Sequence, residues 1–192
     1  MRRIIELGKS QFEVLRVPWY AQNDADWLCV VYSLKMVMDF YKNIHDNPII
    51  RNRTPNTDRD ELIRITNAQY GFGTTVGPTL IKRLSEAYPS MLFELKGTTL
   101  DEIKISIDNN FPVIVVYNPS FLAINEKGPA HAGVVVAVTE DKIILQNPWY
   151  GAGFVLDSNN FENAWELESN WGIFIKPNPQ YSIDESNANK TS

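Results

Sequence analysis

The sequence predicts an α+β fold, with helices in its first half and an antiparallel sheet in its second. In the first half, apolar residues recur at helical spacing, most clearly over residues 26–42. The second half contains four runs rich in β-branched and aromatic residues, "PVIVVYN", "HAGVVVAVTE", "DKIILQNP" and "WGIFIKP", which are typical of strands. Helices followed by strands in this order favour an α+β domain.

The helix predicted over residues 26–42 has one apolar face. Asp26 is the expected N-cap, which would put Cys29 in the first helical turn. The apolar face consists of Val30, Leu34, Val37, Met38 and Tyr41. We expect this face to be buried.

Two loops, three further helices and a strand are predicted before the sheet. Residues 45–61, rich in Pro, Asn and Asp, are expected to form a loop, and a helix follows over 59–69. A glycine-rich turn then leads into a helix with Pro78 near its first turn. Residues 91–97 are expected to form a strand, and residues 98–110 a helix capped by Thr98 or Thr99.

The second half is expected to form most of the sheet. The turn "TEDK" joins the second and third of its four strands into a hairpin, and "FENAWEL" is expected to form a short helix before the last strand. No internal repeat or linker divides the sequence. The prediction is a single domain over residues 1–177, followed by a polar, disordered tail over 178–192.

Composition limits the classes of function. The chain has 192 residues, of which 44% are hydrophobic, enough for one packed core. The apolar runs are too short to span a membrane, and the N-terminus lacks the apolar region of a signal peptide, so we expect a cytoplasmic protein with no membrane partner. A net charge of −5, with scattered basic residues, argues against nucleic acid as a partner. One cysteine and two histidines exclude an internal disulfide and disfavour a metal site, and no cofactor is expected.

The single cysteine, Cys29, has two interpretations. A free cysteine often serves as inert apolar packing. At the start of a helix, however, unpaired backbone N–H groups favour negative charge, which lowers the pKa of a thiol and makes it a candidate nucleophile. Nucleophilic catalysis by cysteine also needs a base and a group that orients this base.

His131 and Asn147 are candidates for those two roles. A hairpin with its turn at residues 139–142 brings both to the same end of the ladder, though not directly opposite each other. The length of an imidazole can bridge that offset, or a bulge can remove it. Asn147 would then accept a hydrogen bond from the imidazole Nδ1–H. Alternatively, His131 is a satisfied or surface histidine and Asn147 an ordinary Asn-Pro turn residue.

Gln22 lies seven residues before Cys29. Its side-chain amide could join the Cys29 backbone N–H in stabilising an oxyanion, or Gln22 could be a solvated loop residue. The aromatic residues nearest to these positions could wall a cleft or pack in the core. They are Trp19, Trp27, Trp149 and Tyr150.

The stretch "GFGTTVG" suggests nucleotide binding only superficially. Val76 occupies the position where the dinucleotide fingerprint needs its third glycine, and no parallel βαβ unit surrounds the stretch. Nucleotide binding is therefore not expected.

The order of the candidate residues resembles that of papain-like cysteine peptidases, closest to the bacteriocin-processing (double-glycine leader) peptidase type and its stand-alone relatives. The resemblance covers residues 17–176 and is carried by "VPWYAQNDADWLC" before "SLKMVMDFY", by "GFGTTVGPTLIKRL", by "HAGVVVAVTEDKIILQNPWYG", and by "FENAWE" before "WGIFIKP". It implies a papain-like fold. It also implies that Cys29 is the nucleophile, His131 the general base and acid, Asn147 the orienting residue and Gln22 the oxyanion-hole donor.

Two features depart from the pattern of this family. Small residues usually follow the cysteine, whereas Val30 and Val31 stand here and could narrow the cleft. The orienting residue is more often Asp in this branch, and Asn147 keeps the hydrogen bond while dropping a charge.

The leading prediction is a cysteine peptidase that cleaves peptide or protein substrates through a thioester intermediate. The same groups could carry out deamidation or transpeptidation. The alternative is an inactive papain-like domain that binds peptides or proteins, for which the Val30–Val31 pair is the main support.

Overall fold

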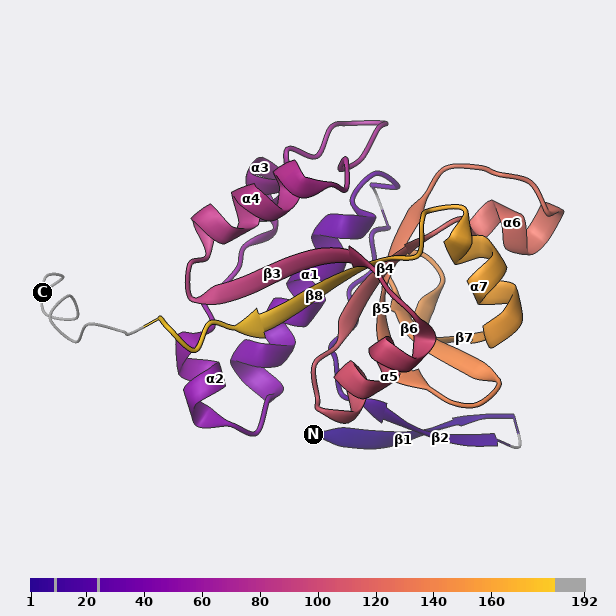
Figure 1. The fold of residues 1–192 in the computed structure, drawn as a ribbon, viewed down its shortest axis with the longest axis horizontal. Coiled ribbons are helices and arrows are strands. Elements are labelled where there is room, and N and C mark those ends of the chain that lie inside the picture. Colours follow the sequence, from indigo (N-terminus) through magenta and orange to yellow (C-terminus); the bar gives the residue numbers. More distant parts are fainter. Residues whose placement is uncertain (9, 24, 182–192) are drawn as a thin grey trace, which may run out of the picture.

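The fold is built on a six-stranded, fully antiparallel sheet in the order β3-β8-β4-β5-β6-β7 (Figure 1). The computed structural model describes residues 1–8, 10–23 and 25–181. The strands of the sheet are β3 (Met91–Gly97), β4 (Val113–Tyr117), β5 (His131–Val138), β6 (Lys142–Asn147), β7 (Gly151–Asp157) and β8 (Trp171–Pro177). The predicted α+β class is confirmed.

Several helices pack against this sheet, and others pack on those helices. They are α1 (Cys29–Asp39) with the π-helical turn η1 (Phe40–Ile44), α2 (Pro48–Arg53), α3 (Arg59–Thr66), α4 (Pro78–Ala87), α5 (Leu100–Asp108), α6 (Pro119–Ile124) and α7 (Ser158–Glu166). In Figure 1, α1 to α4 gather on the left of the molecule, and α6 and α7 on the right. Helices α1, α5 and α7 contact β4, and every residue of β4 is buried, so both faces of this central strand are covered.

Helix α1 forms the centre of the core, as its apolar pattern predicts. All five residues of the predicted face are at most 3% exposed. The helix begins at Cys29, and the residue in the N-cap position is Leu28, which makes no side-chain capping bond. The prediction of Asp26 as N-cap was therefore wrong, because residues 26 and 27 form a turn that delays the start of the helix.

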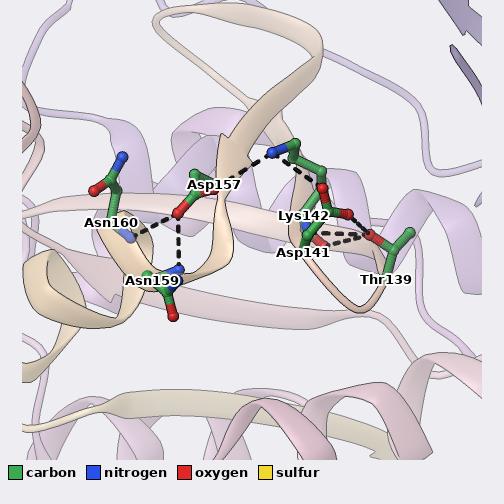
Figure 2. A network of polar contacts seen from close by, with 6 residues as sticks. All are labelled: Thr139, Asp141, Lys142, Asp157, Asn159 and Asn160. Carbon is green, nitrogen blue, oxygen red and sulfur yellow. Dashed lines mark hydrogen bonds and ion pairs between the residues drawn. The ribbon is translucent and has the colours of Figure 1, made fainter.

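The hairpin of β5 and β6 is closed by a polar network at its turn (Figure 2). The Thr139 hydroxyl accepts from the Lys142 N–H at 3.0 Å, and the Thr139 N–H donates to the Lys142 carbonyl at 2.8 Å. The Lys142 ammonium lies 3.4 Å from the carboxylate of Asp157, which also caps α7 by accepting from two backbone N–H groups. This network ties the turn to the start of α7 and holds the hairpin whose other end carries His131 and Asn147.

Several elements were absent from the prediction. The chain begins with a separate hairpin, β1 (Arg2–Leu7) and β2 (Ser10–Leu15), whose charged residues dilute the strand pattern. Strand β7 begins "GAG", which is typical of a loop rather than a strand. The expected loop over 45–61 contains α2, and α6 was also missed. Both helices carry an overlooked signal, an Asn N-cap followed by Pro at the first helical position.

The region after the sheet begins with an anchored residue. The Asn178 N–H donates to the Ser90 carbonyl at 2.8 Å, and its side chain donates to the Pro89 carbonyl at 3.1 Å. The rest of the predicted tail, residues 182–192, lies outside the described residues. Among the described residues, no helix combines the length and the apolar character needed to cross a bilayer.

Candidate active site

A cavity of about 660 Å³ separates the start of α1 from the sheet. Cys29 and His131 both line it, from opposite halves of the sequence. One wall comes from residues 26–30 and from the glycine-rich loop 71–76, and the other from the edges of β4 and β5 and from residues 149–150, 168 and 171. The cavity therefore lies where the helical half of the chain meets the sheet.

Cys29 is half-buried at the first position of α1. Burial raises the pKa of its thiol, because a charged sulfur loses hydration. Three backbone N–H groups oppose this effect: those of Cys29 and Val30, at the uncapped start of the helix, and that of Ala132, the residue after His131. The contact with Ala132 places the thiol beside the first residues of β5.

His131 is the first residue of β5 and is 6% exposed. Its Nε2 lies 3.0 Å from Asn147 Oδ1. Burial lowers the pKa of the imidazole, and the bond to Asn147 opposes that shift. Aromatic rings surround the imidazole edge-on, with Trp149 at 6.3 Å and Tyr150 at 6.2 Å between centroids. Because His131 and Asn147 are both buried, the bond between them is shielded from water.

The contacts of Asn147 fix the tautomer of His131. Asn147 Oδ1 also accepts from the backbone N–H groups of Trp149 at 2.8 Å and Tyr150 at 2.9 Å. Because backbone N–H groups can only donate, the atom that faces His131 must be the oxygen. His131 Nε2 must then carry the proton, which leaves Nδ1 as the acceptor nitrogen on a ring that lines the cavity.

The partner nitrogen differs from the one predicted. Nδ1 was expected to face Asn147, whereas Nε2 does so. The two residues lie diagonally across the ladder, and Nε2, on the far side of the ring from Cβ, is the nitrogen that spans this offset.

A β-bulge places His131 and Asn147 on the same face of the sheet. Without it, the register near the turn would pair Asn147 with Val134, whose side chain points to the other face from His131. The bulge at residues 135–137 shifts the pairing by one, so that Asn147 falls opposite Gly133, in phase with His131. The bulge therefore does not bring Asn147 directly opposite His131. It places the two residues diagonally across the ladder, with their side chains on the same face.

Gln22 lies beside the site but outside the lining of the cavity. It is 4% exposed, and its Nε2 donates to the Asp26 carbonyl at 3.3 Å. Its backbone N–H donates to the Pro148 carbonyl at 3.0 Å, which ties the segment before α1 to the residue after Asn147. Gln22 Oε1 is buried without a hydrogen-bond partner.

The residues after Cys29 occupy different environments. Val31 is fully buried in the core, whereas Val30 is 3% exposed and contributes to the cavity lining. Only Val30 is therefore in a position to narrow the cavity.

The four aromatic residues divide in a similar way. Trp27, Trp149 and Tyr150 line the cavity. Trp19 does not, and its indole N–H instead donates to the Asn147 carbonyl at 2.7 Å. The side chain of Asn147 is thus held by residues on its own turn, and its backbone is held by the segment before α1.

One residue of the site was not anticipated. Tyr117, the last residue of β4, is directly paired with His131 and fully buried. Its hydroxyl accepts from Asn147 Nδ2 at 2.7 Å. The sequence does contain a signal for it, because Tyr117 and His131 flank the connection between two adjacent antiparallel strands. Among the described residues, no three His, Cys, Asp or Glu side chains gather as a metal site.

Comparison with known protein families agrees with this architecture. The model of the Peptidase_C39 like family matches residues 14–172. The chain belongs to this family. Among curated proteins, no match was found.

Solved structures show the same fold as this C39-like chain at low sequence identity. A protein described as a C39-like peptidase from Bacillus anthracis aligns with a TM-score of 0.63 at 16% identity, covering 85% of this chain and 96% of that one. The peptidase domain of Streptococcus ComA, a bifunctional ABC transporter involved in a quorum-sensing pathway, aligns at 0.59 and 15%, covering 85% and 100%. A double-glycine-motif protease from an AMS/PCAT transporter, solved in complex with the leader peptide, aligns at 0.58 and 15%, covering 86% and 94%. These alignments establish a papain-like cysteine peptidase fold.

Proposed function

We propose that this C39-like protein is a cysteine peptidase in which Cys29, His131 and Asn147 form the catalytic triad. The observation that carries the proposal is the bond from His131 Nε2–H to Asn147 Oδ1, on a cavity whose other wall holds Cys29 at a helix start. A base with its tautomer fixed, an orienting group and a thiol at an electropositive helix end are the parts that such a reaction requires.

The resting pair is a neutral thiol and a neutral imidazole. Burial raises the pKa of Cys29 and lowers that of His131, and both shifts disfavour the charged forms. The proton therefore moves as the reaction begins, from Cys29 Sγ to His131 Nδ1. The backbone N–H groups around the sulfur stabilise the thiolate that forms.

Each later step uses the same groups. The thiolate attacks the carbonyl carbon of the scissile bond, and the resulting oxyanion is held by the Cys29 backbone N–H with Gln22 Nε2. The intermediate collapses to a thioester as the C–N bond breaks, and His131 gives its proton to the leaving amine. His131 then removes a proton from water, whose oxygen attacks the thioester carbon. The C–S bond breaks, the acid is released, and His131 returns the proton to Cys29 Sγ.

Gln22 needs a small rearrangement to act in this way. One hydrogen of its amide is engaged with the Asp26 carbonyl, over a long 3.3 Å bond. The second hydrogen remains for the oxyanion. Because the bond to the Asp26 carbonyl is long and weak, the amide can turn toward a substrate carbonyl at little cost.

The lining of the cavity and the known relatives both support a peptide as the substrate. The lining carries exposed aromatic residues, with Phe72 at 90% and Trp149 at 56% exposed, that can pack against peptide side chains. The transporter protease with bound leader peptide supplies one substrate class to test, peptides that contain a double glycine.

The test is cleavage of fluorescence-quenched peptides by wild type and by Cys29→Ala. One set of peptides carries Gly-Gly before the scissile bond and a matched set carries Ala-Ala. We expect Cys29-dependent cleavage and, after acid quenching, an acyl adduct on Cys29 detected by mass spectrometry. Absence of both in a folded protein would overturn the proposal. Binding of the same peptides to the Cys29→Ala variant would then indicate a binding module.

A further inference from the structure

Tyr117 completes the hydrogen bonding of Asn147 from the opposite side to His131. Its hydroxyl lies 2.7 Å from Asn147 Nδ2, and its ring meets the imidazole of His131 edge-on at 5.9 Å. Tyr117 and Asn147 are both 0% exposed. Water therefore cannot replace the hydroxyl as a partner for the amide.

The amide of Asn147 is held at both of its ends. The oxygen accepts from His131 and from two backbone N–H groups, and the nitrogen donates to Tyr117. Without an acceptor at Tyr117, the Asn147 N–H would be buried and unpaired, a condition that native structures avoid. The amide could relieve it only by rotating, which would move Oδ1 away from His131.

The phenol has a property that the backbone partners of Asn147 lack. A backbone N–H can only donate, whereas a hydroxyl can either donate or accept. Tyr117 accepts from an asparagine at position 147, and it would donate to the second oxygen of an aspartate at that position. Burial raises the pKa of Tyr117, so that it remains protonated and able to serve in both ways.

We propose that Tyr117 is a positioning residue of the active site, which orients Asn147 toward His131 and allows asparagine or aspartate to serve at position 147. This inference rests on the proposed function. Tyr117 is not among the residues that line the cavity, and its hydroxyl acts on His131 through Asn147.

The test compares Tyr117→Phe with a matched control, Tyr41→Phe. Tyr41 is also 0% exposed, and its hydroxyl makes a single 2.6 Å bond to the Ile175 carbonyl, away from the cavity. Both variants lose one buried hydroxyl bond. Only the first should change the chemistry of His131.

Two readouts separate positioning from mere stability. The first is the rate of Cys29 alkylation across pH, where we expect Tyr117→Phe to be slowed about tenfold at pH 7 and Tyr41→Phe to match wild type. The second is the ¹⁵N spectrum of the imidazoles. Because the Asn147 bond raises the pKa of His131, Tyr117→Phe should lower that pKa and reduce the Nε2–H tautomer.

Asn147→Asp extends the test. With Tyr117 present, this variant should raise the pKa of His131, since a nearby carboxylate favours the imidazolium. Adding Tyr117→Phe to Asn147→Asp should slow the reaction by more than the tenfold expected in the asparagine background. A buried charged oxygen without a donor is costlier than an unpaired neutral N–H.

Equal behaviour of Tyr117→Phe and Tyr41→Phe in both readouts would overturn the inference. If wild-type alkylation does not depend on His131, the proposed function fails instead, and the two failures are thereby distinguished. Should Tyr117→Phe not fold, 3-fluorotyrosine at position 117 replaces it, since the fluorine weakens the hydroxyl as an acceptor but keeps the ring. With asparagine at position 147, 3-fluorotyrosine should slow the alkylation of Cys29, because the hydroxyl must accept there. In the Asn147→Asp background it should not slow the alkylation, and the opposite pattern would refute the inference.

Discussion

Replacing Asn147 with alanine should destabilise the protein by about 2–6 kcal/mol. Two buried groups lose their partner, the hydroxyl of Tyr117 and Nε2 of His131, and each unpaired buried group costs about 1–3 kcal/mol. The N–H groups of Trp149 and Tyr150 add less, because their bonds to Asn147 are only partly buried. Domains of this kind have only about 5–15 kcal/mol of total stability.

The assay for Asn147→Ala is urea unfolding followed by tryptophan fluorescence. Asn109→Ala is the matched control, since Asn109 is exposed and makes one side-chain bond, to the Ile105 carbonyl. It should change the free energy of unfolding by no more than about 0.5 kcal/mol. If Asn147→Ala were equally mild, the four hydrogen bonds of the Asn147 amide would not be a structural unit, and the reasoning from them would be refuted.

The remaining predictions concern Gln22, the histidines and the glycine loop. Gln22→Ala should lower kcat/KM for peptide cleavage about 10²–10³-fold, as expected for loss of one oxyanion donor. Burial lowers the pKa of His131 and His45, so the unfolded state binds protons first as the pH falls below about 6.5. The free energy of unfolding should therefore decrease from pH 7 to 5, and less steeply in His131→Ala and His45→Ala. Gly71→Ala should cost about 1–2 kcal/mol because its φ is +74°. Gly73→Ala, at φ +76°, should cost more, because its Cβ would also meet a backbone oxygen at 3.1 Å.

A specific result would contradict each of these predictions. Unchanged cleavage by Gln22→Ala would leave the oxyanion to backbone groups alone. Stability that is flat between pH 7 and 5 would mean that the two histidines titrate alike in the folded and unfolded states. Equal costs for Gly71→Ala and Gly73→Ala, measured by urea unfolding, would mean that the loop yields at the second position.

Features of the fold that depend on local sequence were predictable. The apolar spacing around Leu34 and Val37 identified α1, because helical periodicity reports directly which face is buried. The β-branched runs identified β4, β5, β6 and β8 for a similar reason. Strand β7 and the first hairpin were not predicted, because they form strands through pairing with their neighbours rather than through their own composition.

The candidate site was predictable at the level of residues but not of atoms. Cys29 at a helix start, and His131 and Asn147 at one end of a hairpin, follow from the order of elements. Which nitrogen of His131 bonds to Asn147 depends on a bulge in β5, and no local sequence pattern predicts this bulge. The role of Tyr117 depends on β4 lying beside β5, a tertiary fact.

The central claim is that His131 activates Cys29, and the alkylation of Cys29 by iodoacetamide across pH tests it most directly. In wild type, the rate should rise through the pKa of His131, which burial holds below its ordinary value, and then reach a plateau by pH 7. In His131→Ala, the rate should rise only above the ordinary thiol pKa of about 8.5, because burial raises the pKa of Cys29 and no base assists it. Coincident profiles for the two proteins would contradict the account and leave Cys29 as a packing residue.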